Sequence, residues 1–526
     1  MKARVLLVTS EAVPLAKTGG LADVITALTV ELREQGIDAS ILMPGYPSAI
    51  QAAKNLRNIG TFADFPGGEG TLLSGEIAGS DVPVILLDTA RFRARTENPY
   101  VDRDGRELAD NATCFAALSH AAVKLCAGQT TLPKPHVVHA HDWHAGLIPA
   151  LLRAHNITDI GSLLTIHNLA FQGNFPLNIA ASLGLPADVL NADGAEFWGQ
   201  VSFLKAGIRY ADKISTVSHT YAKEILTPRF GHGFEGCLNR RPDTIAAIPN
   251  GIDSDLWNPV GDALIARRFS FRDLKGKAAC KSELKKLFNL MPLNQFAPVL
   301  ALGSRITHQK MADVALAALP TIMATHPYLQ LAVLGCGDPV YEHGFQQLAE
   351  QYPGRVGVYI GYSEKHAHVL HAGADMLLHG SRFEPFGLTP MYAMRYGTIP
   401  IASRVGGLSD TIIDAGSVDQ LVSGANGVLF DGEQPQDMID AVNRTFRIFS
   451  RTREWQKLQR NAMTAECGWS APAQQYIDLY RTIAAPESRH LFPEFLENVG
   501  GEWKPEQHNQ ALNKVFDEAL EPRKAG

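Results

Sequence analysis

Short apolar runs alternate with helical segments along most of the chain. Residues 5–8 form a continuous apolar run, as in strands that are covered on both faces. After a glycine-containing loop, apolar residues recur at helical spacing between 21 and 32, and a second apolar run follows at 41–43. This order predicts a βαβ unit, and such units build parallel sheets.

The same rhythm continues in two long regions separated by a break. In the first region, further strands are predicted at 82–87, 137–139, 163–166 and 214–217. Residues 250–298 contain turn-forming sequence and a charged helix-like stretch, which predicts a connection between two bodies. Beyond it, strands are predicted at 299–302, 329–334, 356–360, 376–379, 399–402 and 428–430. The economical fold is α/β, with two doubly wound Rossmann-like domains facing a central cleft.

Composition narrows the function classes. The 526 residues carry 48 Lys and Arg against 54 Asp and Glu, a formal charge of −6, which argues against nucleic acid or an anionic membrane as partner. No apolar run approaches the roughly 18 residues that cross a bilayer, and the N-terminal apolar stretch is short for a signal peptide. The 6 cysteines are scattered, which suits a reducing compartment. We expect a cytoplasmic protein.

The loops after the predicted strands hold the candidate chemistry, because ligands of open parallel sheets bind beyond the strands' carboxyl ends. Lys17 is followed by Gly19 and Gly20 just before a predicted helix. Paired glycines there let backbone N–H groups approach an anion, and Lys17 adds a full charge. The alternative is an ordinary turn with a solvated lysine.

Three loops in the second half of the chain also place charged residues or paired glycines after a predicted strand. Arg305 and Lys310 bracket a strand-to-helix loop, where a guanidinium and an ammonium suit a diphosphate; two unrelated surface cations are the alternative. Glu384 stands beside Arg382 in a glycine- and proline-shaped turn, which favours a site over a structural ion pair. The pair 406–407 again places glycines before a helix.

The segment 139–144 holds three histidines and Asp142, a composition that suggests a metal site. Its spacing is not H-E-x-x-H and no cysteine joins it, so a polar sugar site fits better. Trp143 would be the aromatic wall of that site and Asp142 would accept sugar hydroxyls. His167 ends another predicted strand, which places it at the same rim.

Other metal or cofactor motifs are weaker. The two D-x-D strings at 102–104 and 253–255 lie in turn-like sequence and are frequent by chance. Gly335 and Gly337 lack a third glycine at the dinucleotide spacing, and no Walker loop occurs. We therefore predict no metal and no cofactor.

Together these segments resemble the family of bacterial glycogen synthases and plant starch synthases, retaining glycosyltransferases of the two-domain GT-B type. The similarity extends from about residue 3 to residue 483. It is carried in order by 17–24, 139–144, 165–168, 250–253, 304–310, 381–385 and 406–408.

The resemblance implies transfer of glucose from ADP-glucose to the nonreducing 4-hydroxyl of an α-1,4-glucan such as glycogen, with retention of configuration. One alternative is a related transferase that uses UDP-glucose or another acceptor. A second is a catalytically weak glucan-binding regulatory protein, against which the joint presence of Lys17, Arg305, Lys310 and Glu384 argues. The oligomeric state stays open.

The resemblance also assigns roles to residues. Its implied catalytic residues are Glu384, His167, Asp142, Arg305 and Lys310. Its implied substrate-binding residues are Lys17, Gly19, Gly20, Tyr100, Asn250, Tyr362, Gly387, Leu388, Thr389, Gly407, Leu408 and Thr411. Glu384 is expected to lie at the donor glucose, Tyr362 to stack on adenine, and the 407–408 backbone to help hold the diphosphate.

Several positions depart from the family pattern. Met311 stands where glycine usually follows Gln-Lys, so we expect an altered phosphate loop. His379-Gly380 replaces a common aliphatic-Pro pair, and Phe386 and 390–391 also differ. We therefore expect a changed wall of the donor pocket.

The resemblance implies four parts of the chain. Residues 1–248 form an acceptor-side domain, 249–468 a nucleotide-sugar-binding domain, and 469–485 a crossover helix that returns to the first domain. Residues 486–526 form a polar tail, in which the apolar positions between 512 and 520 predict one small amphipathic helix.

Overall fold

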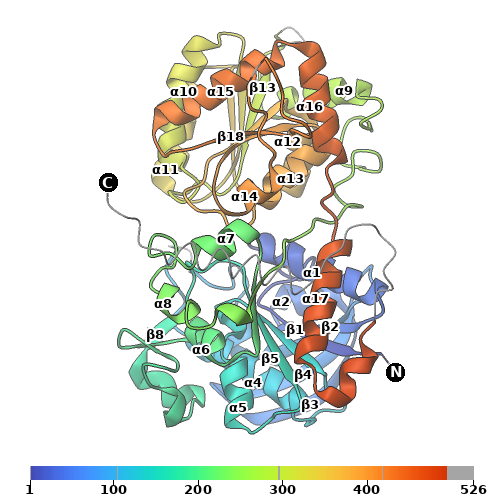
Figure 1. Ribbon diagram of the computed structural model, residues 1–526, viewed down its shortest axis with the longest axis vertical. Helices are drawn as coiled ribbons and strands as arrows, with labels where there is room; N and C mark the ends of the chain where they lie inside the picture. The colour runs from blue at the N-terminus through green and yellow to red at the C-terminus, as the bar shows by residue number, and fades with distance from the viewer. Residues whose placement is uncertain (1, 103–104, 294–296, 418, 494–526) are drawn as a thin grey trace. The chain divides into compact units, whose positions relative to one another are not determined.

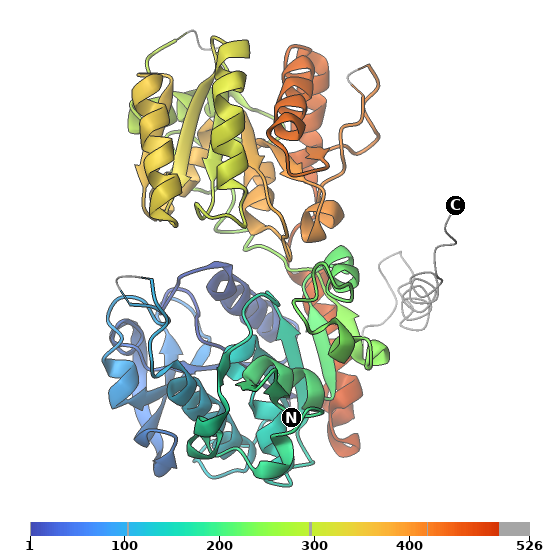
Figure 2. The same cartoon turned by 90° about the vertical axis from the view of Figure 1, so that its left-hand side faces the viewer.

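The computed structural model describes residues 2–102, 105–293, 297–417 and 419–493, and its chain divides into two compact units (Figures 1 and 2). Unit 1 comprises the chain up to Thr216, Glu224–Ile248, and the residues from Ala473 on. Unit 2 comprises Val217–Lys223 and Pro249–Pro472. The amphipathic helix predicted between 512 and 520 lies outside the described residues.

A nine-stranded sheet in the order β12-β11-β7-β6-β1-β2-β5-β4-β3 forms the centre of unit 1. Its parallel strands are β1 (Arg4–Val8), β2 (Asp38–Pro44), β5 (Pro83–Thr89), β6 (Val137–His141), β7 (Gly161–Ile166), β11 (Lys213–Thr216) and β12 (Ile245–Ala247). A small antiparallel sheet joins β8 (Asn174–Pro176), β10 (Gln200–Ser202) and β9 (Glu196–Phe197).

The helices of unit 1 follow the predicted pattern of apolar faces. In α1 (Gly20–Glu34) the residues at helical spacing are the buried ones, and Gly36, at φ +93°, follows its end. The other helices are α2 (Pro47–Ala52), α3 (Ala90–Arg93), α4 (Asn111–Cys126), α5 (Ile148–Ala154), α6 (Phe203–Tyr210), α8 (Glu235–Leu238) and α17 (Ser470–Ile483). The contact boundary between the units falls within α7 (His219–Glu224).

The edge of the unit 1 sheet is the part that apolar runs did not predict. β3 (Ala53–Phe65) and β4 (Gly68–Ile77) form an antiparallel hairpin beside β5. Most side chains of β3 are exposed or half-buried, so the strand needs no continuous apolar sequence. The sheet is therefore mixed at this edge and not wholly parallel.

Unit 2 contains a six-stranded, wholly parallel sheet in the order β15-β14-β13-β16-β17-β18. Its strands are β13 (Val299–Gly303), β14 (Gln330–Gly335), β15 (Val356–Ile360), β16 (Met376–His379), β17 (Ile399–Ser403) and β18 (Val428–Phe430). Its helices are α9 (Lys275–Leu287), α10 (Ala312–Thr325), α11 (Pro339–Gln351), α12 (Glu364–Gly373), α13 (Leu388–Arg395), α14 (Gly406–Thr411), α15 (Pro435–Phe449) and α16 (Thr452–Thr464). The predicted class, doubly wound Rossmann-like α/β, is confirmed.

The charged stretch within 250–298 is not a linker, contrary to the sequence prediction. It forms α9, which packs against α12 inside unit 2. Lys277 is buried there, and its ammonium donates to the carbonyl oxygens of Ala372 (3.1 Å) and Tyr396 (2.8 Å). The charged sequence of this helix therefore conceals that one of its faces is buried. The Lys277 ammonium is tolerated there because backbone carbonyl oxygens accept its hydrogen bonds.

Each sheet has a point where its strand order reverses. After β1 the chain adds strands on one side and then returns to place β6 on the other. In unit 2 the same happens at β13, which lies between β14 and β16. The loops that leave the two adjoining strands diverge, which makes the carboxyl ends of β1 and β6, and of β13 and β16, the expected binding places.

The last described α-helix, α17, packs on unit 1. Figure 1 shows α17 beside the unit 1 sheet, and the Tyr480 hydroxyl lies 2.8 Å from His139 Nδ1. The end of the helix passes so close to β7 that a Cβ at Gly161 would lie 2.5 Å from the Ile483 carbonyl oxygen. Among the described residues, we find no helix with the length and apolarity that a membrane span requires.

Candidate active site

In unit 2, a buried ion pair joins two of the predicted site residues. Lys310 follows β13, Glu384 follows the neighbouring strand β16, and the Lys310 ammonium donates to the Glu384 carboxylate. Their side chains are only 12% and 10% exposed. Burial would raise the pKa of Glu384, but the Lys310 ammonium and a hydrogen bond from His379 outweigh burial and hold this pKa well below its usual range. Glu384 is therefore a carboxylate at neutral pH.

Backbone and side-chain bonds fasten the two loops together. The Arg382 N–H donates to the Gln309 carbonyl (2.9 Å), and the Gln309 side-chain amide donates to the Phe383 carbonyl (3.1 Å). The Arg382 guanidinium donates two hydrogen bonds to the Asp313 carboxylate, at 2.8 and 2.9 Å. Arg382 thus stabilises the loops of the site, while the Glu384 carboxylate faces the Lys310 ammonium.

Arg305 supplies a second cation on the same loop as Lys310. Its side chain is exposed, and one guanidinium nitrogen donates to Gln309 Oε1 at 3.2 Å. The loop after β13 therefore carries one buried ammonium and one accessible guanidinium, a combination that suits a diphosphate.

The glycines near Glu384 serve close packing. A Cβ at Gly407 would lie 2.3 Å from the Phe386 carbonyl oxygen, and the Gly407 N–H donates to the Glu384 carbonyl at 3.0 Å. The Leu408 N–H donates to Val405 (3.1 Å). Both amides thus have acceptors within the protein, which differs from their expected use on a phosphate.

The turn that opens α13 lies against the same place. Gly387 adopts φ +98°, where a side chain is strained, and its Cβ would lie 2.6 Å from Leu408 Cδ2. Leu388 and Thr389 form the first turn of α13. The Thr411 hydroxyl donates to the Gly407 carbonyl at 2.8 Å, inside α14.

Two further predicted residues of unit 2 lie apart from the ion pair in sequence. Tyr362 follows β15 with 63% of its surface exposed, and its hydroxyl donates to Glu364. Asn250 is buried, and its side-chain oxygen is without a hydrogen-bond partner among the described residues. An exposed aromatic ring beyond a strand's carboxyl end suits stacking on a planar ligand.

In unit 1, a buried carboxylate organises the Lys17 loop. Glu11, just beyond β1, accepts hydrogen bonds from the Thr18 N–H, the Thr18 hydroxyl (2.6 Å) and the Gly19 N–H (3.3 Å). The sequence predicted that these amides would bind an anion, and in the structure the Glu11 carboxylate occupies that place. Lys17 Nζ pairs with Asp23 Oδ1 at 2.8 Å.

Open space and an aromatic hydroxyl complete this part of unit 1. No atom of the described residues lies within 4 Å of a Cβ placed on Gly19, and Gly20 begins α1. The Tyr100 hydroxyl bonds to Ser10 Oγ (2.7 Å) and to the Glu11 carboxylate. Burial and the Glu11 charge raise the pKa of Tyr100 well above its usual value, so its hydroxyl keeps its proton.

Asp142 and His167 meet at the carboxyl ends of β6 and β7. Asp142 Oδ1 accepts the His167 N–H (2.7 Å) and the Asn168 N–H (3.3 Å), and Asp142 itself has φ +55°. Burial raises the pKa of Asp142 to about 7, although the two backbone bonds favour its charged form. Burial lowers the pKa of His167 to about 3, so this imidazole is neutral.

A second histidine determines which nitrogen of His167 carries the proton. His141 Nδ1 lies 2.9 Å from His167 Nε2, while the buried His141 Nε2 lacks a partner among the described residues. A buried lone pair costs less than a buried unpaired N–H, so we assign the His141 proton to Nδ1, which donates to His167. His167 then carries its own proton on Nδ1.

Trp143 is not the wall of a sugar site. It is 6% exposed, and its ring packs on Phe115 (5.0 Å between centroids) and Phe175 (5.7 Å). The ring contributes to the core because the chain turns inward directly after Asp142.

The metal alternatives gain no support from the arrangement of side chains. Within the described ranges, no three His, Cys, Asp or Glu side chains are grouped as metal ligands would be. Asp253 Oδ1 accepts the N–H groups of Asp255 and Leu256, both at 2.9 Å, which makes that D-x-D string a local turn. Residues 103–104 of the other string lie outside the described residues.

Three residues that contact the predicted site were not selected from the sequence. Glu11 lies three residues beyond the end of β1, His141 ends β6, and His379 ends β16. Their shared position, at the carboxyl end of a buried parallel strand, is the pattern that identifies them.

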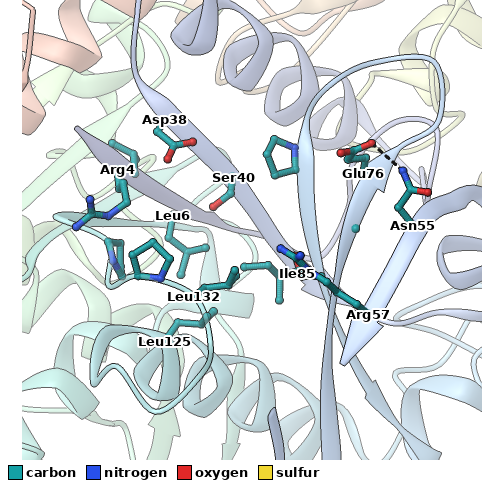
Figure 3. A pocket seen from close by; sticks show the side chains of 16 residues that line it. Arg4, Leu6, Asp38, Ser40, Asn55, Arg57, Glu76, Ile85, Leu125 and Leu132 are labelled. Atoms are coloured by element: carbon teal, nitrogen blue, oxygen red, sulfur yellow. Dashed lines mark hydrogen bonds between the residues drawn. The ribbon is translucent and has the colours of Figure 1, made fainter. Parts of the chain in front are cut away.

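One cavity of unit 1 lies at the other end of the sheet. It has a volume of about 360 Å³ and is lined near the amino ends of β1, β2 and β5, with Arg4, Asp38 and Arg57 at its walls (Figure 3). The predicted site residues follow the carboxyl ends of the strands, so this cavity is not their site.

Comparison with known proteins matches both halves of the chain. The family model for the starch synthase catalytic domain matches residues 4–240, and the model for glycosyl transferases group 1 matches residues 292–460. Glycogen synthase from Ralstonia nicotianae is 52% identical over 92% of this chain and 89% of its own length. Glycogen synthase from Bordetella petrii is 48% identical over 93% and 94%.

A solved structure agrees with these matches. The catalytic domain of starch synthase IV from Arabidopsis thaliana, bound to ADP and acarbose, has a TM-score of 0.82 and 27% identity. The alignment covers 91% of this chain and 99% of the Arabidopsis chain.

Proposed function

The chain belongs to the glycogen synthase and starch synthase family, and from this premise we propose that it transfers glucose from ADP-glucose to the nonreducing 4-hydroxyl of an α-1,4-glucan with retention of configuration. The resemblance inferred from the motifs is thereby confirmed. The observation that carries the proposal is the Lys310–Glu384 pair, with Arg305 beside it, at the reversal point of the unit 2 sheet. The ADP held by the Arabidopsis relative supports an adenine nucleotide donor.

We assign the nucleotide diphosphate to unit 2. As the bond between glucose C1 and the phosphate oxygen breaks, negative charge grows on the departing diphosphate. Arg305 and Lys310, preorganised on one loop, stabilise that charge. Tyr362 stacks on the adenine, and Asn250, Gly387, Leu388, Thr389 and Thr411 complete the proposed donor contacts.

Glu384 acts as a fixed negative charge at the donor glucose. Its low pKa rules out a role as general acid at neutral pH. Its carboxylate is already hydrogen-bonded by Lys310 and His379, which weakens it as a nucleophile. We therefore favour the front-face route, in which the departing phosphate oxygen takes the acceptor hydroxyl proton as the new bond to C1 forms.

We assign the remaining sugar contacts to unit 1. His167 offers its Nδ1–H as a neutral donor, and Asp142 fixes the backbone that carries it. Lys17, Gly19, Gly20 and Tyr100 are the other proposed contacts, with Glu11 fixing their loop. A cytoplasmic place of action remains a prediction.

A transfer assay tests the proposal. Purified protein is incubated with ADP-[14C]glucose or UDP-[14C]glucose and glycogen, and the labelled polymer is counted. We expect label in glycogen from ADP-glucose, and Glu384→Gln should abolish transfer while glycogen binding survives. Transfer from UDP-glucose alone would change the donor, and no transfer from either donor would overturn the proposal.

A further inference from the structure

Three residues next to the Lys310–Glu384 pair make contacts that the proposed transfer reaction does not by itself require. We propose that His379, Met311 and Gly380 form a positioning assembly that fixes the Lys310 ammonium against the Glu384 carboxylate. The inference rests on the proposed function, because it concerns the groups that hold the donor. None of the three residues is assigned contact with substrate; each acts through Lys310 or Glu384.

His379 contacts both charged groups. It ends β16, is 3% exposed, and its Nε2 lies 3.2 Å from Glu384 Oε2 and 3.4 Å from Lys310 Nζ. Burial and the Lys310 charge lower the pKa of His379, so the imidazole is neutral. Its Nδ1 is buried without a partner among the described residues, which favours the tautomer with the proton on Nε2. His379 therefore donates to Glu384, and the carboxylate has two donors.

Met311 holds the turn that presents Lys310. It follows Lys310 directly, is fully buried, and has φ +54° and ψ 37°, a conformation that a side chain disfavours. The side chain is nevertheless anchored: its Sδ accepts the Ser403 hydroxyl at 3.5 Å. Packing of this side chain therefore keeps the Lys310 turn in a conformation that the backbone alone would not favour.

Gly380 provides the space that the Met311 side chain needs. A Cβ at Gly380 would lie 3.2 Å from Met311 Cβ, 3.4 Å from Met311 Sδ and 3.0 Å from Met438 Cε. The next residue, Ser381, donates its N–H to the same Ser403 hydroxyl at 2.8 Å. The peptide that carries His379 thus abuts the residue that follows Lys310, and the two loops fit only as a matched pair.

A double-mutant cycle tests this fit. Gly380→Ala is compared with Met311→Gly and with both together, using kcat and the ADP-glucose KM. A displacement of about 1 Å at reacting groups costs up to about 100-fold in rate, so Gly380→Ala should lower kcat by about 10- to 100-fold. Met311→Gly removes the two Met311 contacts, and the remaining one is with Met438 Cε, the end of a flexible side chain, so the double variant should recover most of the loss. If the losses in kcat of the two single variants add up in the double variant, or if Gly380→Ala is fully active, the proposed positioning assembly is wrong.

The same cycle is measured by urea unfolding, without any substrate. A stability coupling between positions 311 and 380 is expected even if the enzyme proves to use another donor, so failure of the proposed function is recognised separately. Absence of that coupling would count against the packing, whatever the substrate.

A second variant set tests the hydrogen bond from His379 and does not depend on that packing. His379→Val should lower kcat with little change in glucan KM, and His379→Gln, which keeps an N–H donor, should restore part of it. The titratable groups that face Glu384 are Lys310 and His379. Loss of one donor removes a hydrogen bond that fixes the Glu384 carboxylate, so the loss in kcat with unchanged glucan KM, and its partial rescue by His379→Gln, are the readouts.

His371 supplies the matched control. It is another buried imidazole of unit 2, on α12, with its ring against Trp257. His371→Val should change stability with little effect on kcat. If His379→Val and His371→Val lower kcat equally, and His379→Gln restores none of the loss, His379 is merely structural and the proposal fails.

Discussion

At the scale of single residues, the Lys310 ammonium has two negatively charged partners. It neutralises Glu384 in the described structure and, in our proposal, the diphosphate during the reaction. Lys310→Ala would leave a buried carboxylate unpaired, a defect that costs about 3–5 kcal/mol of stability. Substitution of Lys310 therefore mixes folding with catalysis, whereas the exposed Arg305 separates them.

Arg305→Ala tests the diphosphate clamp. We expect kcat/KM for ADP-glucose to fall by an amount equivalent to about 2–4 kcal/mol, the usual cost of losing one preorganised donor. The unfolding midpoint should stay close to wild type because the side chain is exposed. Near-normal turnover would remove Arg305 from the mechanism.

The buried histidines of unit 1 make stability depend on pH. Burial lowers the pKa of His144 to about 3, whereas an unfolded histidine titrates near 6.5. Below pH 6.5 the His144 imidazole is protonated in the unfolded chain but stays neutral in the folded chain. The stability of the folded state is therefore undiminished by this group above pH 6.5 and falls as the pH is lowered towards 3. His144→Gln removes this loss, which amounts to about 2 kcal/mol at pH 5. Urea unfolding at pH 7 and pH 5 measures it, and equal pH slopes in both proteins would contradict it.

The sequence predicted the charged site residues better than their neighbours. Lys310 and Glu384 were found because each follows an apolar run. His379 belongs to such a run, so it was noted as a departure and not as a partner of Glu384. Likewise, nothing local to Glu11 shows that it accepts the amides of a loop seven and eight residues later. Contacts between loops depend on tertiary structure, which periodicity does not encode.

At the scale of elements, buried parallel strands were predictable and exposed ones were not. β16 and β18 have the predicted bounds because strands covered on both faces are continuous apolar runs. The β3–β4 hairpin is half solvated and escaped this criterion. The helix α9 was expected as a charged helical stretch, but its buried lysines concealed that it packs inside unit 2. The proposed crossover helix, α17, packs with its last residue, Ile483, against Gly161 at the start of β7.

Gly161→Ala tests how tightly α17 is seated. Its Cβ would lie 2.5 Å from the Ile483 carbonyl, so the helix end must shift, at a cost of about 1–3 kcal/mol. Gly236→Ala in α8 is the control, since its Cβ has no neighbour within 4 Å in the described part of the chain and alanine favours a helix. Urea midpoints should fall for the first variant only; an equal change in both would show that α17 adapts freely.

At the scale of the whole molecule, the proposed chemistry relies on side-chain cations. Arg305 and Lys310 provide positive charge at the proposed diphosphate, and the described residues hold no ligand cluster of three. We expect EDTA to leave glucose transfer from ADP-glucose unchanged, as measured by labelled glycogen. Loss of transfer that added Mg²⁺ restores would reinstate the D-x-D strings as ligands.

The assignment of α17 to unit 1 also bears on how the protein is made. Unit 1 starts with the first strand of the chain but receives its last helix only after Pro472, when all of unit 2 has been synthesised. Until Tyr480 leaves the ribosome, His139 lacks its hydroxyl partner and the side of β7 at Gly161 is uncovered. The domain that is begun first is thus finished last, and a nascent chain arrested anywhere before α17 carries an incomplete amino-terminal half.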